Sequence, residues 1–473
     1  MRRSITTGRS LALLSLVAIA TSTASAQQSS ERPPARPLGA ALATSEPMGA
    51  VSAVRQLPGG RLLVNDPVKR RVVLLDSMMK TVSVIADTTP ATQNAYGVRG
   101  GGILPYRGDS TLFLDPASLS MLVLDPNGVI VRVKAAPRPD DVNSLVGGAL
   151  GFPGFDSKGR LIYRTTGLQF NRRNAGGGGG NGAGFQPPVF PDSAPLVRFD
   201  LATRTLDTAA YIKVTAPKIN VAEVDGRRQI SIVVNPMPEV DDWAVLPDGR
   251  IAIVRKDYHV DYIDANGAKV SAPRIPFDWQ RLTDSAKSAV IDSARALAAR
   301  GGPGLAQLFG GGGGPGGGGG GFGGGFGGGG FGGGGGFGGG GFGGGRGGGG
   351  GDGPPPPRRD AAGGGGAAGR AQGAQGGGRQ INFVAPNELP DYKPAFTNGS
   401  VRADAEGKLW VRLIPTKAAT GGPEYDVIDP NGKLVDRVTL PAGTVIAGFG
   451  QGGVVYLGVR DAAGTHVVRA REK

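Results

Sequence analysis

A four-residue turn that recurs along the chain limits what it can fold into more than any other feature. Residues 264–267 read Asp-Ala-Asn-Gly, and residues 125–128 and 429–432 both read Asp-Pro-Asn-Gly, each directly after a short apolar run. Asn-Gly accepts the left-handed backbone of a tight turn, so each copy predicts a hairpin of two antiparallel strands. Hairpins repeated in this way indicate a repeat architecture built from small β-sheets.

A second turn, in which a glycine leads into a new strand, also repeats. It is found at residues 57–62, 156–161, 246–251 and 404–409, with looser copies at 107–109 and 450–453. Between residues 240 and 270 the two turns divide the chain into four short strands, which cannot bury their apolar faces alone. We count six such units, at residues 51–85, 102–133, 152–214, 240–270, 401–440 and 444–469. The sequence therefore predicts an all-β protein, a six-bladed β-propeller.

The last unit shows only three strands of its own, which predicts how the ring closes. Residues 39–44 form an isolated candidate strand near the N-terminus. A strand from that end would complete the last sheet and remove its open edge. We expect residues 39–44 to be this clasp.

The N-terminus predicts export. Three arginines precede an apolar run over residues 11–20, and Ala24-Ser25-Ala26 suits cleavage by a signal peptidase. We expect residues 1–26 to be a signal peptide and the polar residues 27–38 to be a flexible leader. The chain has no cysteine, so no disulfide is expected in the periplasm or outside the cell, where we place the protein. No later apolar stretch is long enough to span a bilayer, and a soluble monomer is expected.

Two glycine-rich insertions and a helix interrupt the repeat. The first insertion, residues 172–185, lies inside unit three. A helix is predicted within residues 279–300, because Thr283 can cap it and these residues share one face: Ala286, Ala289, Val290, Ala294, Leu297 and Ala298. Residues 301–380 are mostly glycine and should stay disordered, since glycine loses much entropy on ordering and buries little. The propeller is thus divided into residues 39–300, with blades 1–4, and residues 381–473, with blades 5 and 6.

The strand order places both insertions and the helix on one face of the propeller. Strands in a blade alternate in direction, so the loops between strands 2 and 3 share a face with the connections between blades. The first insertion lies in such a loop, and the helix and the second insertion lie in such a connection. We call this the insertion face. Insertions gathered on one face of a repeat protein mark its working face.

Polar residues gather at the ends of the second strands on this face. They are Asn65, Asp66, Asp115, Arg164, Arg255, Lys256, Asp257, Tyr258 and Arg412. As a ring around the central channel they would bind an acidic or hydroxylated ligand. The alternative is structural, because aspartate and proline also terminate strands and cap turns.

Residues suited to catalysis are few. The chain has two histidines, His259 and His466, in different units. It contains no nucleophile elbow, no metal-spaced histidine pair and no phosphate-binding loop. The Asp-x-Asn-Gly turns lack the further acidic ligands of a calcium loop. We therefore expect no catalytic residue, no metal site and no cofactor. Arg346 and the spaced phenylalanines resemble nucleic-acid-binding segments, but the signal peptide argues against a nucleic acid partner.

The repeats resemble those of exported bacterial six-bladed propellers of the TolB-like and NHL type. The resemblance is carried by residues 246–251, 260–264 and 404–411, and by Arg-Ile-Pro-Phe at residues 274–277. It covers about residues 48–470 apart from the glycine tract, and its motifs are structural. In that group the fold serves mainly as a binding scaffold, which implies binding more than chemistry. The long glycine insertion departs from the pattern.

Two functions are consistent with these observations. The first is an exported, non-enzymatic propeller that binds a protein, peptide or glycan of acidic character on its insertion face. The second is a metal-dependent propeller hydrolase or lactonase whose metal is held by Asp66, Asp115 and Asp257. A metal site needs several acids that converge, whereas basic residues, Lys256 included, outnumber acids at these positions.

Overall fold

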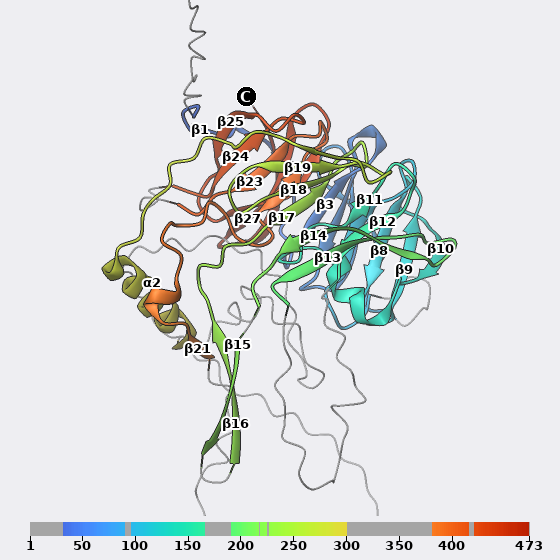
Figure 1. Cartoon of the computed structure of the whole chain (residues 1–473). Helices are drawn as coiled ribbons and strands as arrows, with labels where there is room; N and C mark the ends of the chain where they lie inside the picture. Colours follow the sequence, from blue (N-terminus) through green and yellow to red (C-terminus); the bar gives the residue numbers. More distant parts are fainter. Residues whose placement is uncertain are drawn as a thin grey trace, which may run out of the picture.

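The computed structural model describes residues 32–89, 96–165, 191–216, 218–224, 227–299, 381–415 and 421–472. The expected signal peptide, the first glycine insertion and the glycine tract lie outside the described residues. Figure 1 shows the whole chain.

Six four-stranded units arranged as a propeller confirm the predicted fold class. Blade 1 is β3 (Ala53–Gln56), β4 (Leu62–Asp66), β5 (Arg71–Leu75) and β6 (Thr81–Ala86). Blade 2 is β7 (Gly102–Pro105), β8 (Thr111–Asp115), β9 (Ser120–Leu124) and β10 (Ile130–Ala135). Blade 3 is β11 (Gly154–Phe155), β12 (Leu161–Arg164), β13 (Ser193–Phe199) and β14 (Leu206–Lys213).

The second half of the ring follows the same order. Blade 4 is β17 (Asp242–Val245), β18 (Ile251–Val254), β19 (Val260–Ile263) and β20 (Lys269–Ser271). Blade 5 is β22 (Val401–Ala403), β23 (Leu409–Arg412), β24 (Glu424–Ile428) and β25 (Leu434–Thr439). Blade 6 is β26 (Thr444–Gly450), β27 (Val454–Asp461), β28 (Gly464–Arg471) and, from the N-terminus, β2 (Ala41–Thr44). Short 3-10 turns are η1 (Pro58–Gly60), η2 (Pro139–Leu145) and η3 (Pro386–Glu388).

The clasp is confirmed. β2 pairs antiparallel with β28, with Ala43 opposite Arg469, and so completes the last sheet. The inner strands of successive blades contact one another, and β26 of blade 6 contacts β3 of blade 1. The ring therefore closes by sheet pairing within one chain.

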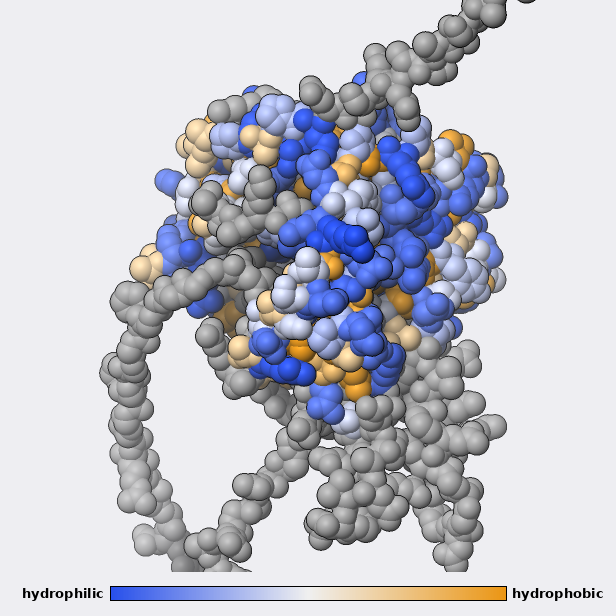
Figure 2. Space-filling view, turned by 60° about the vertical axis from the view of Figure 1, so that its left-hand side comes forward, coloured by the Kyte–Doolittle hydropathy of each residue, from blue (hydrophilic) through white to orange (hydrophobic). Residues whose placement is uncertain are grey.

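The core lies between the blades. Strand side chains alternate between the two faces of each sheet, and each face packs on the next blade. Trp243 and Trp410 are fully buried in this way, as are Leu62 and Val64 of β4. Burying each such large apolar side chain contributes about 1.5–3 kcal/mol, so the blade contacts hold the ring together. Hydrophilic residues cover most of the face seen in Figure 2.

A small appended module hangs from the insertion face. β15 (Lys218–Val224) and β16 (Arg227–Val234) form a ribbon that projects from the propeller, and β21 (Ile381–Phe383) pairs parallel with β16. Helix α2 (Asp284–Ala299) contacts β21. The predicted helix is present, over residues 284–299, whereas the ribbon was not predicted.

The apolar face of α2 differs slightly from the predicted one. Ile291 is buried against Val384 and Leu389, whereas Ala289 is exposed. Thr283 Oγ1 accepts a hydrogen bond from the N–H of Ala286 at 3.2 Å, which confirms the predicted cap. No helix among the described residues is long and apolar enough to cross a membrane.

Part of the expected leader is described. β1 (Arg36–Pro37) pairs parallel with β25 and adds a fifth strand to blade 5. It leads through the buried Leu38 to β2. We call Arg32 to Thr44 the N-terminal strap.

Candidate functional site

The predicted site residues of blade 1 hold loops in place. Asp66 is buried and accepts hydrogen bonds from the N–H groups of Gly49 and Ala50 and from Arg71 Nε, at 2.9–3.1 Å. Asn65 is also buried, and its amide nitrogen donates to Ser52 Oγ at 2.8 Å and to the carbonyl of Gly101 at 2.7 Å. Its amide oxygen accepts from the hydroxyl of Tyr96 at 2.9 Å. These contacts occupy both side chains.

Asp115 has the same role in blade 2. It is buried and accepts hydrogen bonds from the N–H groups of Ala117 and Ser118 and from Ser118 Oγ, at 2.5–3.2 Å. The structural alternative thus fits Asn65, Asp66 and Asp115. Aspartates 66 and 115 lie in different blades with separate partners, and so does Asp257 of blade 4.

Arg255 joins β19 to the residue before β17 in blade 4. Its Nη1 lies 2.8 Å from Asp241 and its Nε 2.6 Å from Asp261. Although burial opposes the shift, hydrogen bonds from Ser271, Lys269 and Arg255 lower the pKa of Asp261 to about 2. Arg255 is therefore part of an ion-pair network within its own blade.

Each residue of the loop after Arg255 has a partner of its own. Lys256 Nζ lies 3.3 Å from Glu239, and Asp257 contacts His259 Nδ1 at 2.7 Å and Arg274 at 3.0 Å. Tyr258 is buried with a left-handed φ of 63°, and its hydroxyl donates to Asp426 of blade 5 at 2.6 Å. This loop lies at the junction of blades 4 and 5.

Arg164 and Arg412 occupy matching positions. Each is the last residue of its second strand, where Arg164 pairs with Leu196 and Arg412 with Tyr425. Arg255 lies one residue beyond the last pair of β18. Because side chains along a strand alternate between its two faces, Arg255 lies on the opposite face of its sheet from Arg164 and Arg412. The three arginines therefore do not form one ring.

Arg164 lies beside a buried carboxylate from the next blade. Asp242, the first residue of β17, is 2% exposed and accepts a hydrogen bond from the N–H of Val401 at 2.9 Å. Burial raises the pKa of Asp242 to about 7, against the opposing backbone hydrogen bonds. Burial also lowers the pKa of Arg164, and Asp242 opposes that shift. Blades 3, 4 and 5 therefore meet at this pair.

Two buried polar atoms at this junction lack a hydrogen-bond partner among the described atoms. They are Arg164 Nε, a donor, and Asn398 Oδ1, an acceptor. Asn398 belongs to the turn that ends at Ser400 and Val401, whose N–H binds Asp242. We call Arg164, Asp242 and Asn398 the axial site. Buried polar groups in native proteins are nearly always bonded, so these two atoms are candidate contacts for a polar ligand or water.

Glycine is required where the axial site meets blade 3. Gly399 has a φ of 73°, and a Cβ there would lie 2.6 Å from the carbonyl oxygen of Gly148. A side chain would be strained and would push the two loops apart. The turn carrying Asn398 is therefore held against residues 148–149.

A further cation lies on an inner strand next to the axial site. Arg402 of β22 is 4.0 Å from the centre of the Phe152 ring and donates to the carbonyl of Ile446. Burial lowers the pKa of Arg402 to about 10. This side chain brings together blades 3, 5 and 6, and it adds positive charge close to the axis.

Arg164 and Arg412 were among the predicted site residues, whereas Asp242, Asn398 and Arg402 were not. The predicted set was limited to the ends of second strands, and these three further residues lie in or before first strands, which line the axis. The pairs Asp241-Asp242 and Asn398-Gly399 just ahead of apolar runs were the available signal. Among the described residues, no three acidic, histidine or cysteine side chains are grouped so as to hold a metal ion.

No family model and no curated protein matches the sequence. Several solved structures are similar. A putative exported protein from Bacteroides fragilis aligns at 9% identity over 92% of this chain and 94% of its own, with a TM-score of 0.39. A calcium-binding protein, regucalcin, from Agrobacterium tumefaciens aligns at 10% identity over 93% and 98%, with a TM-score of 0.37. A gluconolactonase from Xanthomonas campestris aligns at 10% identity over 93% and 99%, with a TM-score of 0.35. Similarities this distant say nothing about the ligand of this chain.

Proposed function

We propose that this propeller is an exported, non-enzymatic binding scaffold that holds an acidic or polyhydroxylated protein, peptide or glycan at the axial site. The observation that carries the proposal is the presence of an unbonded buried donor, Arg164 Nε, and an unbonded buried acceptor, Asn398 Oδ1, at the junction of three blades. Arg164 belongs to blade 3 and is influenced by the charge of Asp242 of blade 4, and Asn398 precedes Val401 of blade 5, whose N–H binds Asp242. Convergence of side chains from several blades is typical of a ligand site.

The chemistry of the axial site selects the ligand class. A ligand hydroxyl accepts from Arg164 and donates to Asn398, whereas a carboxylate accepts from Arg164 alone. Arg402 adds positive charge nearby and favours an acidic group. We expect binding to weaken at high ionic strength, because salt screens this attraction.

We favour this function over the metal-dependent hydrolase because the carboxylates of Asp66 and Asp115 already accept several hydrogen bonds each. The N-terminal sequence and the resemblance to TolB-like and NHL-type propellers support a periplasmic or secreted location. The appended module on the insertion face offers further contact area for the same ligand.

The test is isothermal titration with three probes: hexaglutamate, an oligogalacturonate and neutral maltohexaose. We expect oligogalacturonate, which is both acidic and hydroxylated, to bind best. Arg164→Gln and Asn398→Ala should each weaken binding about tenfold, the loss of one hydrogen bond to a buried or charged group. The matched controls Lys158→Gln and Lys433→Gln, exposed on the opposite face, should change it little.

Two outcomes would contradict the proposal. If none of the three probes binds, the ligand class is wrong. If the axial variants and the opposite-face controls weaken binding equally, the attraction is nonspecific and the axial site is not the binding site.

A further inference from the structure

A second site lies at the junction of blades 4 and 5, at Asp426 of β24, two strands away from β22 in the sheet of blade 5. Its occupant is Arg32 of the N-terminal strap. Arg32 Nη2 lies 3.0 and 3.1 Å from the two carboxylate oxygens of Asp426, and Nη1 lies 3.1 Å from Asp278. The guanidinium is 4.9 Å from the centre of the Phe277 ring. Nη1, Nη2 and the flat face of the guanidinium therefore contact the propeller, whereas Nε is buried without a hydrogen-bond partner among the described atoms.

The receptor side of this contact is built by the propeller. Asp426, on β24, is fully buried and also accepts from the Tyr258 hydroxyl at 2.6 Å. Phe277 packs edge-on against Tyr258 at 5.3 Å. We call Asp426, Tyr258, Phe277 and Asp278 the guanidinium cage. Carboxylate oxygens and an aromatic face suit arginine better than lysine, because only arginine is both forked and flat.

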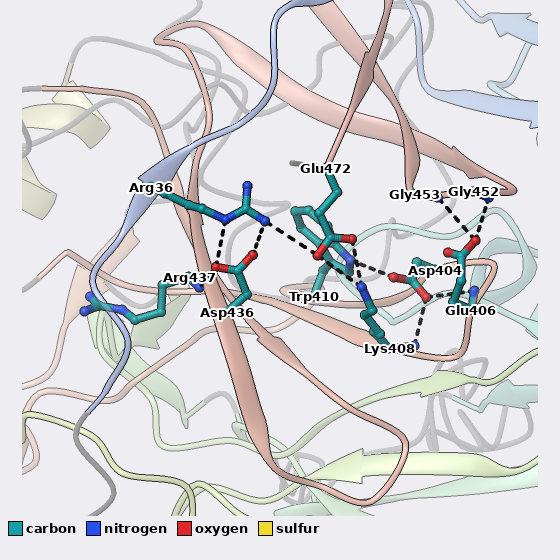
Figure 3. Close-up of polar contacts among 10 residues, drawn as sticks. All are labelled: Arg36, Asp404, Glu406, Lys408, Trp410, Asp436, Arg437, Gly452, Gly453 and Glu472. Carbon is teal, nitrogen blue, oxygen red and sulfur yellow. Dashed lines mark hydrogen bonds and ion pairs between the residues drawn. The ribbon is translucent and has the colours of Figure 1, made fainter.

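A second arginine of the strap is bound four residues later. Arg36 donates through Nε to Asp436 at 3.1 Å, and its guanidinium lies 3.8 Å from Glu472 (Figure 3). Lys408 holds Glu472 in place at 2.9 Å. The backbone is bound as well, since Leu38 N–H donates to the carbonyl of Thr439 at 3.1 Å. This is recognition by addition of an extended segment to a sheet edge.

The groove is chemically suited to a basic, proline-containing segment. Four acids, Asp278, Asp426, Asp436 and Glu472, face the strap in a chain whose net charge is +14. Prolines at 33, 34 and 37 cannot donate backbone hydrogen bonds, and the carbonyl of Pro33 accepts one from Arg437 at 3.3 Å. Two arginines four residues apart fix the position of the segment along the edge of the sheet.

The ring does not need this segment in order to close. β2 completes blade 6, whereas β1 is a fifth strand on blade 5 and pairs over two residues only. Without β1, blade 5 would have four strands like the other blades. The groove is therefore an addition to the fold rather than part of its closure.

We propose that this groove, with the guanidinium cage at one end, is a recognition site for an extended Arg-Pro-Pro-x-Arg-Pro segment of a separate polypeptide. The N-terminal strap fills it in cis and competes with such a partner. Recognition depends on the charged guanidinium groups, which donate paired hydrogen bonds to the carboxylates.

The test uses the full chain with Arg32→Ala and Arg36→Ala together, which frees both arginine positions. The probe is a fluorescent peptide with the sequence of residues 32–39, compared with the same peptide carrying citrulline for both arginines. Fluorescence anisotropy should show the arginine peptide binding about tenfold or more tightly than the citrulline peptide, the effect of charge-assisted hydrogen bonds. Wild-type protein should bind it more weakly, because its own strap competes.

A matched acid control makes the test specific. In the double variant, Asp436→Asn should weaken binding, whereas Asp140→Asn, an exposed acid in another blade, should not. Equal binding of the citrulline peptide, or no binding to the double variant, would overturn the proposal. So would equal binding to wild type and double variant.

Should the double variant lose cooperative melting, the single variant Arg32→Ala answers the same question. Millimolar ethylguanidinium should raise its melting temperature, and ethylammonium at the same concentration should not. Failure of that rescue, or equal rescue by both cations, also overturns the proposal.

Discussion

Buried polar side chains at the strand ends of blades 1 and 2 hold the backbone of neighbouring loops in place through hydrogen bonds. Asp66 shows the pattern, because its carboxylate bonds the loop before β3 to the loop after β4. Its substitution leaves buried N–H groups without acceptors. A buried N–H group that has lost its acceptor costs its full desolvation free energy. The hydrogen bond that was present before the substitution contributed only a little net stability.

We therefore expect Asp66→Ala to lower the free energy of unfolding by about 3 kcal/mol, since a buried acceptor of several bonds is removed. Urea denaturation followed by circular dichroism measures it. The exposed control Asp140→Ala should change it by less than about 0.5 kcal/mol. A loss at Asp66 no larger than at Asp140 would mean that the loop contacts do not contribute to stability.

Asp242 makes stability depend on pH. Burial raises its pKa from 3.8 to about 7, so between these values the folded state keeps a proton that the unfolded state has released. Its contribution to stability is therefore full below about pH 4 and is lost as pH rises to about 7. Asp242→Asn should remove this contribution, on the order of a few kcal/mol at most. The melting temperatures of wild type and Asp242→Asn are measured from pH 4 to 8. As the pH rises, the melting temperature of the variant should increase relative to that of wild type.

Elements whose apolar residues recur with a clear strand or helix period were predicted from the sequence, and the other elements were not. The propeller strands alternate apolar and polar residues between turns with glycine or asparagine, and these turns force a reversal. The Asp-x-Asn-Gly turns are structural, since Asp264 Oδ1 accepts the N–H groups of Asn266 and Ala268 at 2.8 Å. The ribbon of β15 and β16 was missed although residues 219–221 and 230–232 alternate and Asp225-Gly226 is a hairpin turn sequence, because it does not repeat the pattern of the blades.

The cap of α2 gives a prediction for a single element. Thr283→Ala removes the acceptor for the N–H of Ala286 and should destabilise the helix by about 1 kcal/mol. Amide hydrogen exchange within α2 measures this locally. Ser288→Ala, in the exposed middle of the same helix, should instead slow exchange slightly, because alanine has the higher helix propensity. If the two substitutions have the same sign, Thr283 is not acting as a cap.

The whole molecule carries a long insertion between two elements that touch. The glycine tract follows α2 and precedes β21, and α2 contacts β21 while β21 pairs with β16. Because the ends are already held together, closing the loop costs little, and that cost grows slowly with length.

Deleting residues 310–378 should therefore leave the propeller folded, with a melting temperature within a few degrees of wild type. Differential scanning calorimetry measures it, and limited proteolysis should cut the wild-type chain first near Arg346 or Arg358. Loss of cooperative melting in the deletion variant would show that the tract packs against the ring.

The sequence by itself determined the repeat, the number of blades, the clasp and the helix, because turn chemistry and strand alternation are local properties of the chain. It located the insertion face, since strand direction alone assigns each loop to a face. Only the tertiary structure decided which polar residues are used in hydrogen bonds within one blade and which lie where several blades meet. Asp66 and Asp242 are both aspartates beside apolar strands, yet Asp66 accepts several hydrogen bonds within blade 1, whereas Asp242 joins three blades. Such differences depend on contacts between residues more than 150 positions apart, such as Asp242 with Val401 and Arg32 with Asp426.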